Sequence, residues 1–166
     1  LQSTSHMTRF IRHLFISCIA LTMGISVCAA QASLPVKSIE NLDLQRYMGP
    51  WFEVAKFPNW FQRKCQRNTQ AIYKLQSAQQ IEVLNKCTTD TNEVIQAIGT
   101  ARPNGSGLPA QLEVRFAPSW VSWLPFTWGA YWVLDLDKDY QLAAVGDPSK
   151  NYLWILSRTP QVSEEA

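Results

Sequence analysis

The sequence predicts an all-β domain folded as an eight-stranded antiparallel up-and-down β-barrel, and three observations support this prediction. Eight short runs of alternating or β-branched character follow one another between Trp51 and Ser157. Most links between the runs are of hairpin length and rich in turn residues. No helical period persists between the runs, which argues against an α/β fold. A barrel of about eight strands can hold one small ligand.

A short helical turn and four runs form the first half of the expected barrel. The turn should lie just before Gly49, because glycine allows a sharp change of direction there. Polar residues 76–80 separate the second run from the third, and the segment Arg-Pro-Asn-Gly-Ser-Gly at 102–107 ends the fourth. The four expected strands are Trp51–Phe57, Thr69–Leu75, Ile81–Cys87 and Glu93–Ala101.

Four further runs complete the barrel and lead into a C-terminal segment. Turn residues at 137–139 and 147–151 separate the last three runs. At the end, Pro160 and the acidic residues after it resemble the first turn of a helix, so a truncated C-terminal helix is expected over Thr159–Ala166. The four expected strands are Ala110–Phe116, Ala130–Leu136, Gln141–Gly146 and Tyr152–Ser157.

Length and composition limit the class of protein. The 166 residues fit one domain, and a chain that is 46% hydrophobic and 17% charged has enough apolar surface to fold. The formal charge of +2 comes from Arg9 and Arg12, because the chain without them has 13 basic and 13 acidic residues. With no long basic stretch, we expect no binding to nucleic acid.

Residues 7–32 have the three parts of a secretory signal peptide. Two arginines precede an apolar run, Leu14–Val27, and Ala30-Gln31-Ala32 follows it. We therefore expect residues 1–32 to be an upstream remnant plus a signal peptide, and residues 33–166 to be the folded domain. Cleavage after Ala32 would release the domain, whereas cleavage before Cys28 would leave a cysteine for a lipid anchor at a membrane surface.

Two cysteines, Cys65 and Cys87, remain after the expected cleavage at Ala32. An exported chain enters an oxidising compartment, where such a pair tends to be bonded. The second and third runs would form a hairpin with both cysteines at its open end, which makes a disulfide geometrically plausible. The alternative is a reactive Cys65 thiol at the barrel mouth.

No catalytic or metal-binding constellation is present in the expected mature chain. His6 and His13 both precede the cleavage site, so the usual general base and the commonest metal ligand are lost with the signal peptide. Neither a phosphate-binding loop nor zinc-ligand spacing occurs. The carboxylates at positions 135, 137 and 139 fall in a turn, where solvation explains them. We therefore expect no enzyme activity, no metal and no cofactor.

Three segments in order resemble the signatures of one family. Tyr47–Val54, containing Gly49-Pro50-Trp51, looks like the first signature, and Asp139–Gly146 is similar to the second. Leu153–Pro160, containing Arg158, looks like the third. Over residues 42–164 the chain resembles the bacterial lipocalins, the branch closest to apolipoprotein D and the plant temperature-induced lipocalins. The remaining alternative is an unrelated β-protein with an incidental Gly-x-Trp.

The resemblance implies structural roles for Gly49, Trp51 and Arg158. Trp51 would fill the closed end of the barrel. Arg158 would lie over its indole ring and join the last strand to the first through a cation–π contact of roughly 1–2 kcal/mol. The resemblance also implies a small lipophilic ligand as partner. One branch of the family uses a cysteine at the barrel mouth for isomerisation, which keeps a role for Cys65 open.

Ligand-binding residues are expected at inward positions, which alternate along each strand. Parity with Trp51 indicates that Glu53, Ala55 and Phe57 point inward, and the family pattern turns Trp154 toward the cavity. Such an apolar and aromatic lining suits a fatty acid or lysophospholipid; the alternative is a barrel filled by its own side chains. The expected lining comprises Phe57, Tyr73, Val83, Asn85, Val114, Tyr131 and Trp154.

The loop at residues 117–129 carries Trp120, Trp123, Phe126 and Trp128, too many large apolar side chains for an ordinary surface loop. Tryptophan favours the interface between membrane and water. The loop is therefore expected to touch a membrane or to act as a lid. The alternatives are packing against the barrel and a homodimer contact.

These observations favour a carrier of lipophilic molecules in the periplasm, with attachment to the outer membrane through Cys28 as an alternative. A second hypothesis is a Cys65-dependent isomerase or peroxidase acting on a bound lipid. A third is a membrane-associated domain that binds a partner through the Trp-rich loop.

Overall fold

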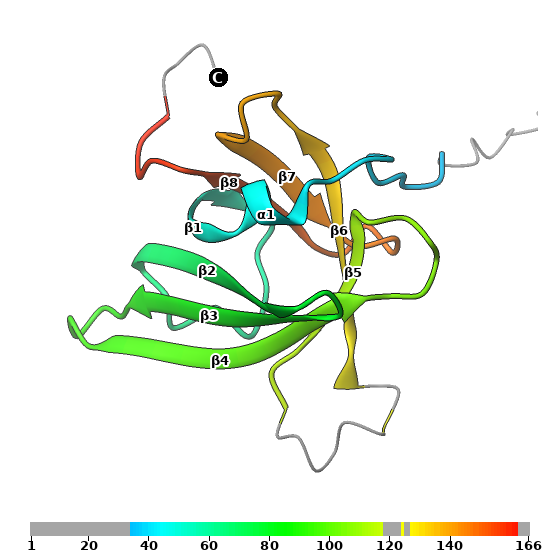
Figure 1. Ribbon diagram of the computed structural model, residues 1–166. Helices are drawn as coiled ribbons and strands as arrows, with labels where there is room; N and C mark the ends of the chain where they lie inside the picture. The colour runs from blue at the N-terminus through cyan, green and yellow to red at the C-terminus, as the bar shows by residue number, and fades with distance from the viewer. Residues whose placement is uncertain (1–33, 118–123, 125–126, 163–166) are drawn as a thin grey trace, which may run out of the picture. The chain divides into compact units, whose positions relative to one another are not determined.

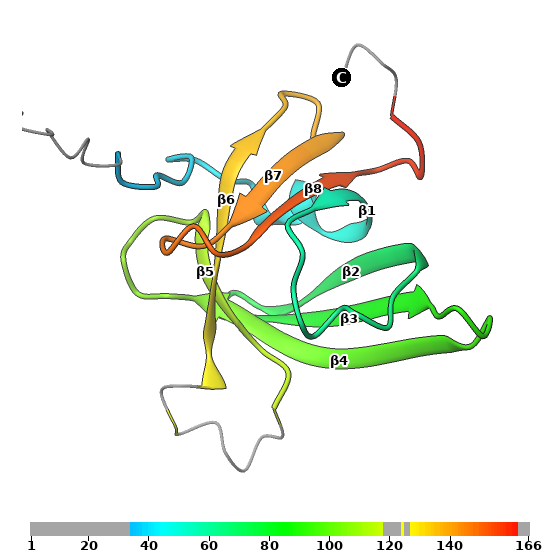
Figure 2. The ribbon, with the colours of Figure 1, turned by 180° about the vertical axis from the view of Figure 1, so that it is seen from behind.

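The computed structural model describes residues 34–117, 124 and 127–162, and these residues form one closed β-barrel. Its eight strands run in chain order, β1 to β8, and β8 pairs with β1 to close the sheet (Figures 1 and 2). Every pair of neighbouring strands is antiparallel. The predicted eight-stranded up-and-down barrel is therefore confirmed.

The strands lie within a few residues of their expected positions. The helical turn before the first strand is also present, as α1. The elements are α1 (Leu44–Tyr47), β1 (Gly49–Lys56), β2 (Arg67–Ser77), β3 (Gln80–Thr88), β4 (Val94–Pro103), β5 (Gln111–Arg115), β6 (Gly129–Leu136), β7 (Leu142–Gly146) and β8 (Leu153–Ser157).

No helix begins at Thr159, where the sequence predicted one. Residues 158–161 are bends, and Val162 is the last described residue. The Thr159 hydroxyl bonds to the Gln161 carbonyl, 2.6 Å away, within this segment. The remainder of the expected C-terminal helix lies outside the described residues.

The passage from α1 into β1 depends on a cap and a glycine. The Asp43 side chain accepts hydrogen bonds from the amides of Gln45 and Arg46, at 2.9 and 3.2 Å, which caps the helical turn. Gly49 has φ 94°, a backbone conformation that residues with a Cβ atom rarely adopt. This glycine turns the chain sharply, so that β1 begins only two residues after the end of α1.

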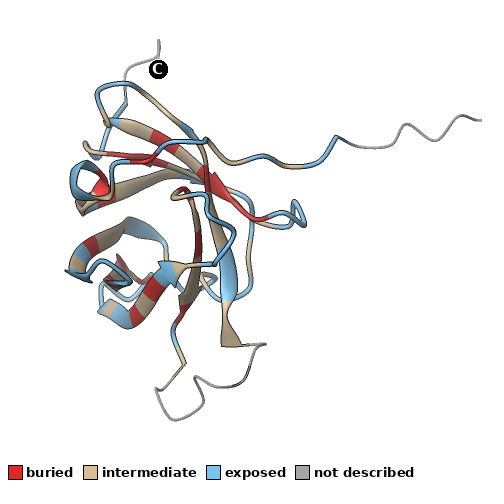
Figure 3. Cartoon of the chain, turned by 45° about the vertical axis from the view of Figure 1, so that its right-hand side comes forward, coloured by how far each residue is buried: buried red, intermediate tan, exposed pale blue. Residues whose placement is uncertain are grey.

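Strand register places Trp51, Ala71 and Asn85 side by side on the inner face of β1, β2 and β3. Burial alternates over the first half of β3 because successive side chains point to opposite faces; Figure 3 colours the chain by burial. In β3, for example, Ile81 and Val83 are 1% and 2% exposed. The core therefore lies inside the barrel and continues up to α1.

One irregularity changes which residues of β1 face inward. The pairing of β1 with β8 runs from Glu53 opposite Leu156 to Ala55 opposite Ile155, so the register shifts between them. Beyond this β-bulge, Lys56 lies opposite Trp154. The parity that was expected to turn Ala55 and Phe57 inward therefore does not hold past Glu53.

The signal peptide and the processing site at Cys28 lie outside the described residues. Within residues 34–117, 124 and 127–162, no helix is long and apolar enough to cross a membrane.

Candidate functional site

The closed end of the barrel is built around Trp51, whose side chain is fully buried. Its indole N–H donates to the Tyr47 carbonyl at 2.8 Å, and the two rings lie 5.0 Å apart. The Arg158 guanidinium lies 3.9 Å from the centre of the indole ring. The structure therefore places Trp51 and Arg158 in the contact that the family resemblance implied.

Arg158 also joins three separate parts of the chain through backbone carbonyls. Its guanidinium donates to Pro50 at 2.9 Å, to Arg46 at 2.7 Å and to Tyr140 at 3.2 Å. A Cβ atom at Gly49 would lie 3.4 Å from Arg158 Nη1, an ordinary van der Waals contact, so it is the positive φ that requires glycine there. Arg158 thus ties β8 to α1, β1 and the β6–β7 hairpin.

Three tyrosine hydroxyls meet inside the barrel, and one of the three rings, that of Tyr47, packs beside Trp51. Tyr131 Oη lies 2.8 Å from Tyr47 Oη and 2.8 Å from Tyr73 Oη. Burial raises the pKa of Tyr73 to about 12 and raises the pKa values of Tyr47 and Tyr131 well above the usual range. The hydroxyls of this tyrosine trio are therefore neutral at physiological pH.

The predicted lining residues other than Phe57 occupy inward positions by register. Val83 lies opposite Tyr73, Val114 lies opposite Ala101, and Tyr131 lies opposite Leu112. Trp154 lies opposite the fully buried Val145. Asn85 belongs to the row of Trp51. Those that stay partly exposed despite facing inward are Asn85, Val114, Tyr131 and Trp154.

Phe57 lies one residue beyond β1 and is 47% exposed. The bulge after Glu53 removes the parity argument on which its inward placement depended. Lys56 takes the place opposite Trp154 instead.

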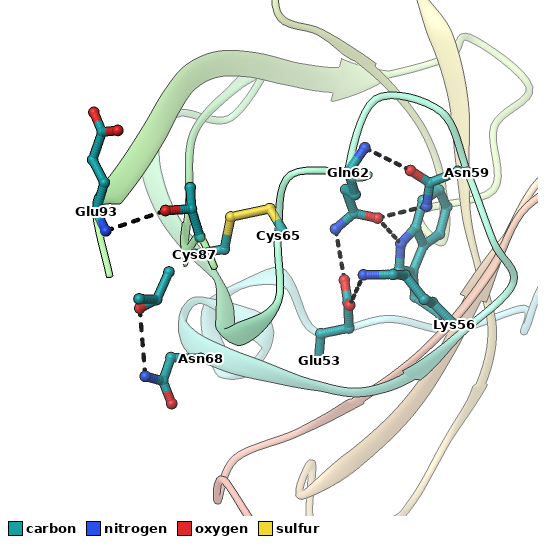
Figure 4. The surroundings of a disulfide bond; sticks show 11 residues. Glu53, Lys56, Asn59, Gln62, Cys65, Asn68, Cys87 and Glu93 are labelled. Atoms are coloured by element: carbon teal, nitrogen blue, oxygen red, sulfur yellow. Dashed lines mark hydrogen bonds and ion pairs between the residues drawn. A yellow bond between two sulfur atoms is a disulfide. The ribbon is translucent and has the colours of Figure 1, made fainter. Parts of the chain in front are cut away.

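A polar network occupies the other end of the barrel, the mouth. Glu53 accepts from Lys56 at 2.5 Å and from Gln62 at 2.6 Å. The Gln62 carbonyl oxygen accepts from the Trp154 indole N–H at 3.0 Å and from Asn59 at 2.6 Å. Figure 4 shows Glu53, Lys56, Asn59 and Gln62 turned toward one another. The Glu53 side chain is only 9% exposed, so the network holds a nearly buried ion pair of zero net charge.

Aromatic rings cover this network on one side. Phe61 lies 5.6 Å from Tyr152 and 6.3 Å from Trp154, and Tyr152 stacks on Trp154 at 5.7 Å. Trp60 extends the cluster outward and is 72% exposed. The β1–β2 loop, residues 57–66, therefore packs against β8 at the mouth.

A disulfide holds the other end of the same loop. Cys65 is bonded to Cys87 in β3, and the two Cα atoms are 5.4 Å apart (Figure 4). The predicted pairing is confirmed. Because Cys65 carries no free thiol in this state, the reactive-thiol alternative has no nucleophile here.

Only Trp128 and Leu124 of the Trp-rich loop's large apolar residues fall within the described residues. The Trp128 ring lies 3.9 Å from the Arg102 guanidinium and 4.7 Å from that of Arg115. Trp128 therefore packs on two strands of the barrel wall, as in the packing alternative. Trp120, Trp123 and Phe126 lie outside the described residues.

The acidic turn between β6 and β7 has a structural role. Asp137 accepts hydrogen bonds from the backbone amides of Asp139, Gln141 and Leu142. Desolvation raises the pKa of this carboxyl, but the backbone hydrogen bonds outweigh it and the pKa is lowered. Among the described residues, no group of three or more His, Cys, Asp or Glu side chains could hold a metal ion.

A hollow of about 320 Å³ lies near the rim of β1–β3. Phe52, Gln70 and Lys86 contribute to it, and their register puts them on the outer face of the sheet. This hollow is therefore distinct from the predicted lining around Tyr131 and Trp154.

A model of the Lipocalin-like domain matches residues 42–166. Temperature-induced lipocalin-1 of Arabidopsis thaliana is 41% identical over 128 residues, which are 76% of this chain and 68% of that protein. This chain belongs to the lipocalin family. Outer membrane lipoprotein Blc of Escherichia coli is 37% identical over 150 residues, 88% of this chain and 80% of that protein. Apolipoprotein D of mouse is 31% identical over 133 residues, 76% of this chain and 66% of that protein.

Several site residues of this lipocalin were not found by sequence reasoning. Tyr47 was read only as part of the first signature, although its place four residues before Trp51 on a helical turn carries it into the interior. Lys56 was missed because a bulge has no clear sequence signal. Gln62 was missed because its role depends on how the β1–β2 loop folds back over the mouth.

Proposed function

We propose that this lipocalin binds, stores or transports a small lipophilic ligand of the fatty-acid or lysophospholipid class in the bacterial cell envelope. The observation that best supports this is a set of inward side chains that stay partly exposed: Tyr131 in the tyrosine trio, Val114, and Trp154 at the mouth. An apolar contact of a few hundred Å² at about 25 cal/mol per Å² suffices for micromolar binding after association costs.

The polar mouth suggests how such a ligand would lie. An alkyl chain would occupy the apolar interior, and a polar group would remain near Glu53, Lys56 and Gln62. These three side chains already satisfy one another, so a ligand must replace their contacts with equivalent ones to avoid a desolvation cost. Asn85 offers a further polar contact. Its side-chain amide faces inward and has no hydrogen-bond partner among the described residues.

Ligand binding inside the barrel is tested by replacing one small inward-facing residue with a large one, which occupies part of the interior. Ala71 faces inward beside Trp51, whereas Lys74, on the same strand, points outward. We expect native mass spectrometry to find lipid on the wild type and on the matched control Lys74→Trp. Fluorescence titration with palmitate or lysophosphatidylcholine should show affinity reduced by about tenfold or more in Ala71→Trp.

Failure of both lipids to bind the wild type at micromolar concentrations would reject a lipid-binding function. Equal affinity of the Ala71→Trp and Lys74→Trp variants would show that any binding takes place outside the barrel. Ala71→Leu, with its smaller side chain, serves if the tryptophan variant does not fold, as judged by circular dichroism.

We also propose that the protein is located in the periplasm. The alternative is attachment to the outer membrane through a lipid on Cys28. The name of the Escherichia coli relative, outer membrane lipoprotein Blc, supports an envelope setting. Labelling cells with radioactive palmitate distinguishes the alternatives. A label that Cys28→Ser abolishes would establish lipidation, and an unlabelled periplasmic protein would establish cleavage without an anchor.

We propose that the chain is not an enzyme. The Cys65-dependent isomerase or peroxidase hypothesis requires a thiolate, and Cys65 is bonded to Cys87. A thiol count under native and reducing conditions tests this directly. One free thiol at Cys65 in the freshly purified native protein would return that hypothesis to consideration.

Contact with a membrane surface is a second candidate function. The exposed Trp60 lies on the β1–β2 loop, and the Trp-rich loop follows β5. In an up-and-down barrel every odd-numbered strand ends at the same end, which here is the mouth, so both loops begin there. Tryptophan favours the interface between membrane and water. Liposome co-sedimentation of a Trp120→Ala, Trp123→Ala double variant tests the Trp-rich loop, and unchanged partitioning would exclude insertion by these residues. Sedimentation velocity of the same variant tests the homodimer alternative.

A further inference from the structure

The tyrosine trio joins three distant parts of the chain inside the barrel. Tyr47 comes from α1, Tyr73 from β2 and Tyr131 from β6, and both Oη–Oη distances are 2.8 Å. The Tyr73 ring lies 5.7 Å from Tyr47 and 5.9 Å from Tyr131. The three hydroxyls therefore form a short chain with Tyr131 in the middle.

A count of hydrogens shows that this chain is incomplete. Each hydroxyl brings one hydrogen to donate, and each of the two bonds uses one. One O–H in the trio therefore has no acceptor among the described residues, whichever way the bonds run. Tyr47 is 1% and Tyr73 7% exposed, so a spare donor on either of these residues is shielded from bulk water, and one on Tyr131 points into the barrel interior. A buried donor without an acceptor is costly, and native proteins rarely leave one unpaired.

The surroundings of the trio limit what could accept this hydrogen. Val83 pairs with Tyr73 and Leu112 with Tyr131, and both are 2% exposed, so the inward positions directly opposite these two tyrosines are apolar. Tyr131 itself is only partly buried and belongs to the inward row that we propose as ligand lining. An acceptor oxygen that reaches the trio from the interior must therefore belong either to a buried water or to an otherwise apolar molecule.

We propose that the tyrosine trio is a subsite for a neutral hydrogen-bond-accepting oxygen at the deep end of the ligand. The chemical class is a lipophile that carries a carbonyl or ether oxygen at the end that enters the barrel first. A hydrocarbon end would leave the spare O–H unsatisfied, whereas a carbonyl would accept it. This inference rests on the proposed binding function. The structural alternative is a buried water that accepts the hydrogen permanently.

A matched pair of ligands tests the subsite. Methyl undecyl ketone and n-tridecane have the same number of carbon atoms and differ in that one CH₂ group of the alkane is a carbonyl in the ketone. Their affinities are measured by displacement of a fluorescent probe from the wild type and from a variant with Tyr47→Phe, Tyr73→Phe and Tyr131→Phe together. Replacing all three hydroxyls removes every donor and keeps the rings, which makes the change mild for folding.

We expect the ratio of ketone to alkane affinity to fall about fivefold to tenfold in the triple variant, while alkane affinity changes little. Tyr140→Phe is the matched control, because Tyr140 lies outside the trio and its hydroxyl accepts from the Asp43 amide. This control should leave the ratio unchanged. In the infrared spectrum, the carbonyl band of the ketone should shift to lower frequency on binding to the wild type and not on binding to the triple variant.

An unchanged affinity ratio in the triple variant, or a bound carbonyl band at its frequency in hydrocarbon solvent, would overturn the inference. The infrared measurement on the wild type decides the question even if the triple variant does not fold. Failure of both test ligands while palmitate binds would overturn the subsite alone. Failure of every lipid would overturn the proposed binding function with it.

Discussion

Replacing Arg158 by methionine should destabilise the barrel substantially, although Arg158 is partly exposed. The guanidinium lies 3.9 Å from the Trp51 ring and donates to the carbonyls of Pro50, Arg46 and Tyr140. Methionine keeps most of the apolar stem and removes the charge together with every one of these contacts. The variant therefore isolates the polar and cation–π contributions.

The expected loss follows from the number of contacts. A hydrogen bond from a charged donor contributes about 1.5–3 kcal/mol, and partial exposure of Arg158 reduces this to about 1 kcal/mol each. The cation–π contact adds about 1 kcal/mol. The sum for three hydrogen bonds and one ring contact is about 4 kcal/mol. For a domain of this size, this corresponds to a fall in Tm of roughly 10–15 °C.

Urea unfolding followed by tryptophan fluorescence gives the free energy of unfolding, and Arg102→Met is the matched control. The Arg102 guanidinium also lies 3.9 Å from an indole ring, that of Trp128, but its polar contact among the described residues is an ion pair with Glu113 at the surface. We expect the control to lose about 1–2 kcal/mol. Equal losses in the two variants would refute the argument that the three carbonyl contacts, rather than ring stacking, join the strands.

Three further predictions concern the disulfide, the tyrosine trio and the acidic turn. Replacing Cys65 and Cys87 together by serine should lower the free energy of unfolding by about 3 kcal/mol, because their 22-residue separation closes a loop in the unfolded chain; an unchanged urea midpoint would contradict this. The folded-state pKa of Tyr73 is raised to about 12, so its contribution to stability is complete below pH 10 and is lost as the pH rises through 12. Absorbance titration at alkaline pH should show late ionisation in native protein and normal ionisation in urea; identical curves would refute it. The pKa of Asp137 is lowered from 3.8, so its contribution is present above that pH and lost on further acidification. Asp137→Asn should therefore flatten the acid limb of stability against pH, and an unaltered limb would exclude this role.

Strand positions were predictable because each strand is a local pattern. Alternation and turn residues placed all eight strands, and the β3 residues Ile81 and Val83 are buried as their parity predicted. The same parity argument failed after Glu53, where the β-bulge turns Lys56 toward Trp154. A bulge depends on how two strands more than 90 residues apart are paired, and neither strand alone carries that information.

The sequence by itself determined the family and the barrel topology, because these depend on local periodicity and on short motifs; it favoured the Cys65–Cys87 pairing, which the structure then confirmed. Only the tertiary structure decided which polar groups meet inside the barrel. The tyrosine trio and the Glu53–Lys56–Gln62 network each combine residues from different elements or from a loop that folds back. Their hydrogen bonds form only when barrel closure brings those elements within about 3 Å, a distance that no pattern along the chain encodes.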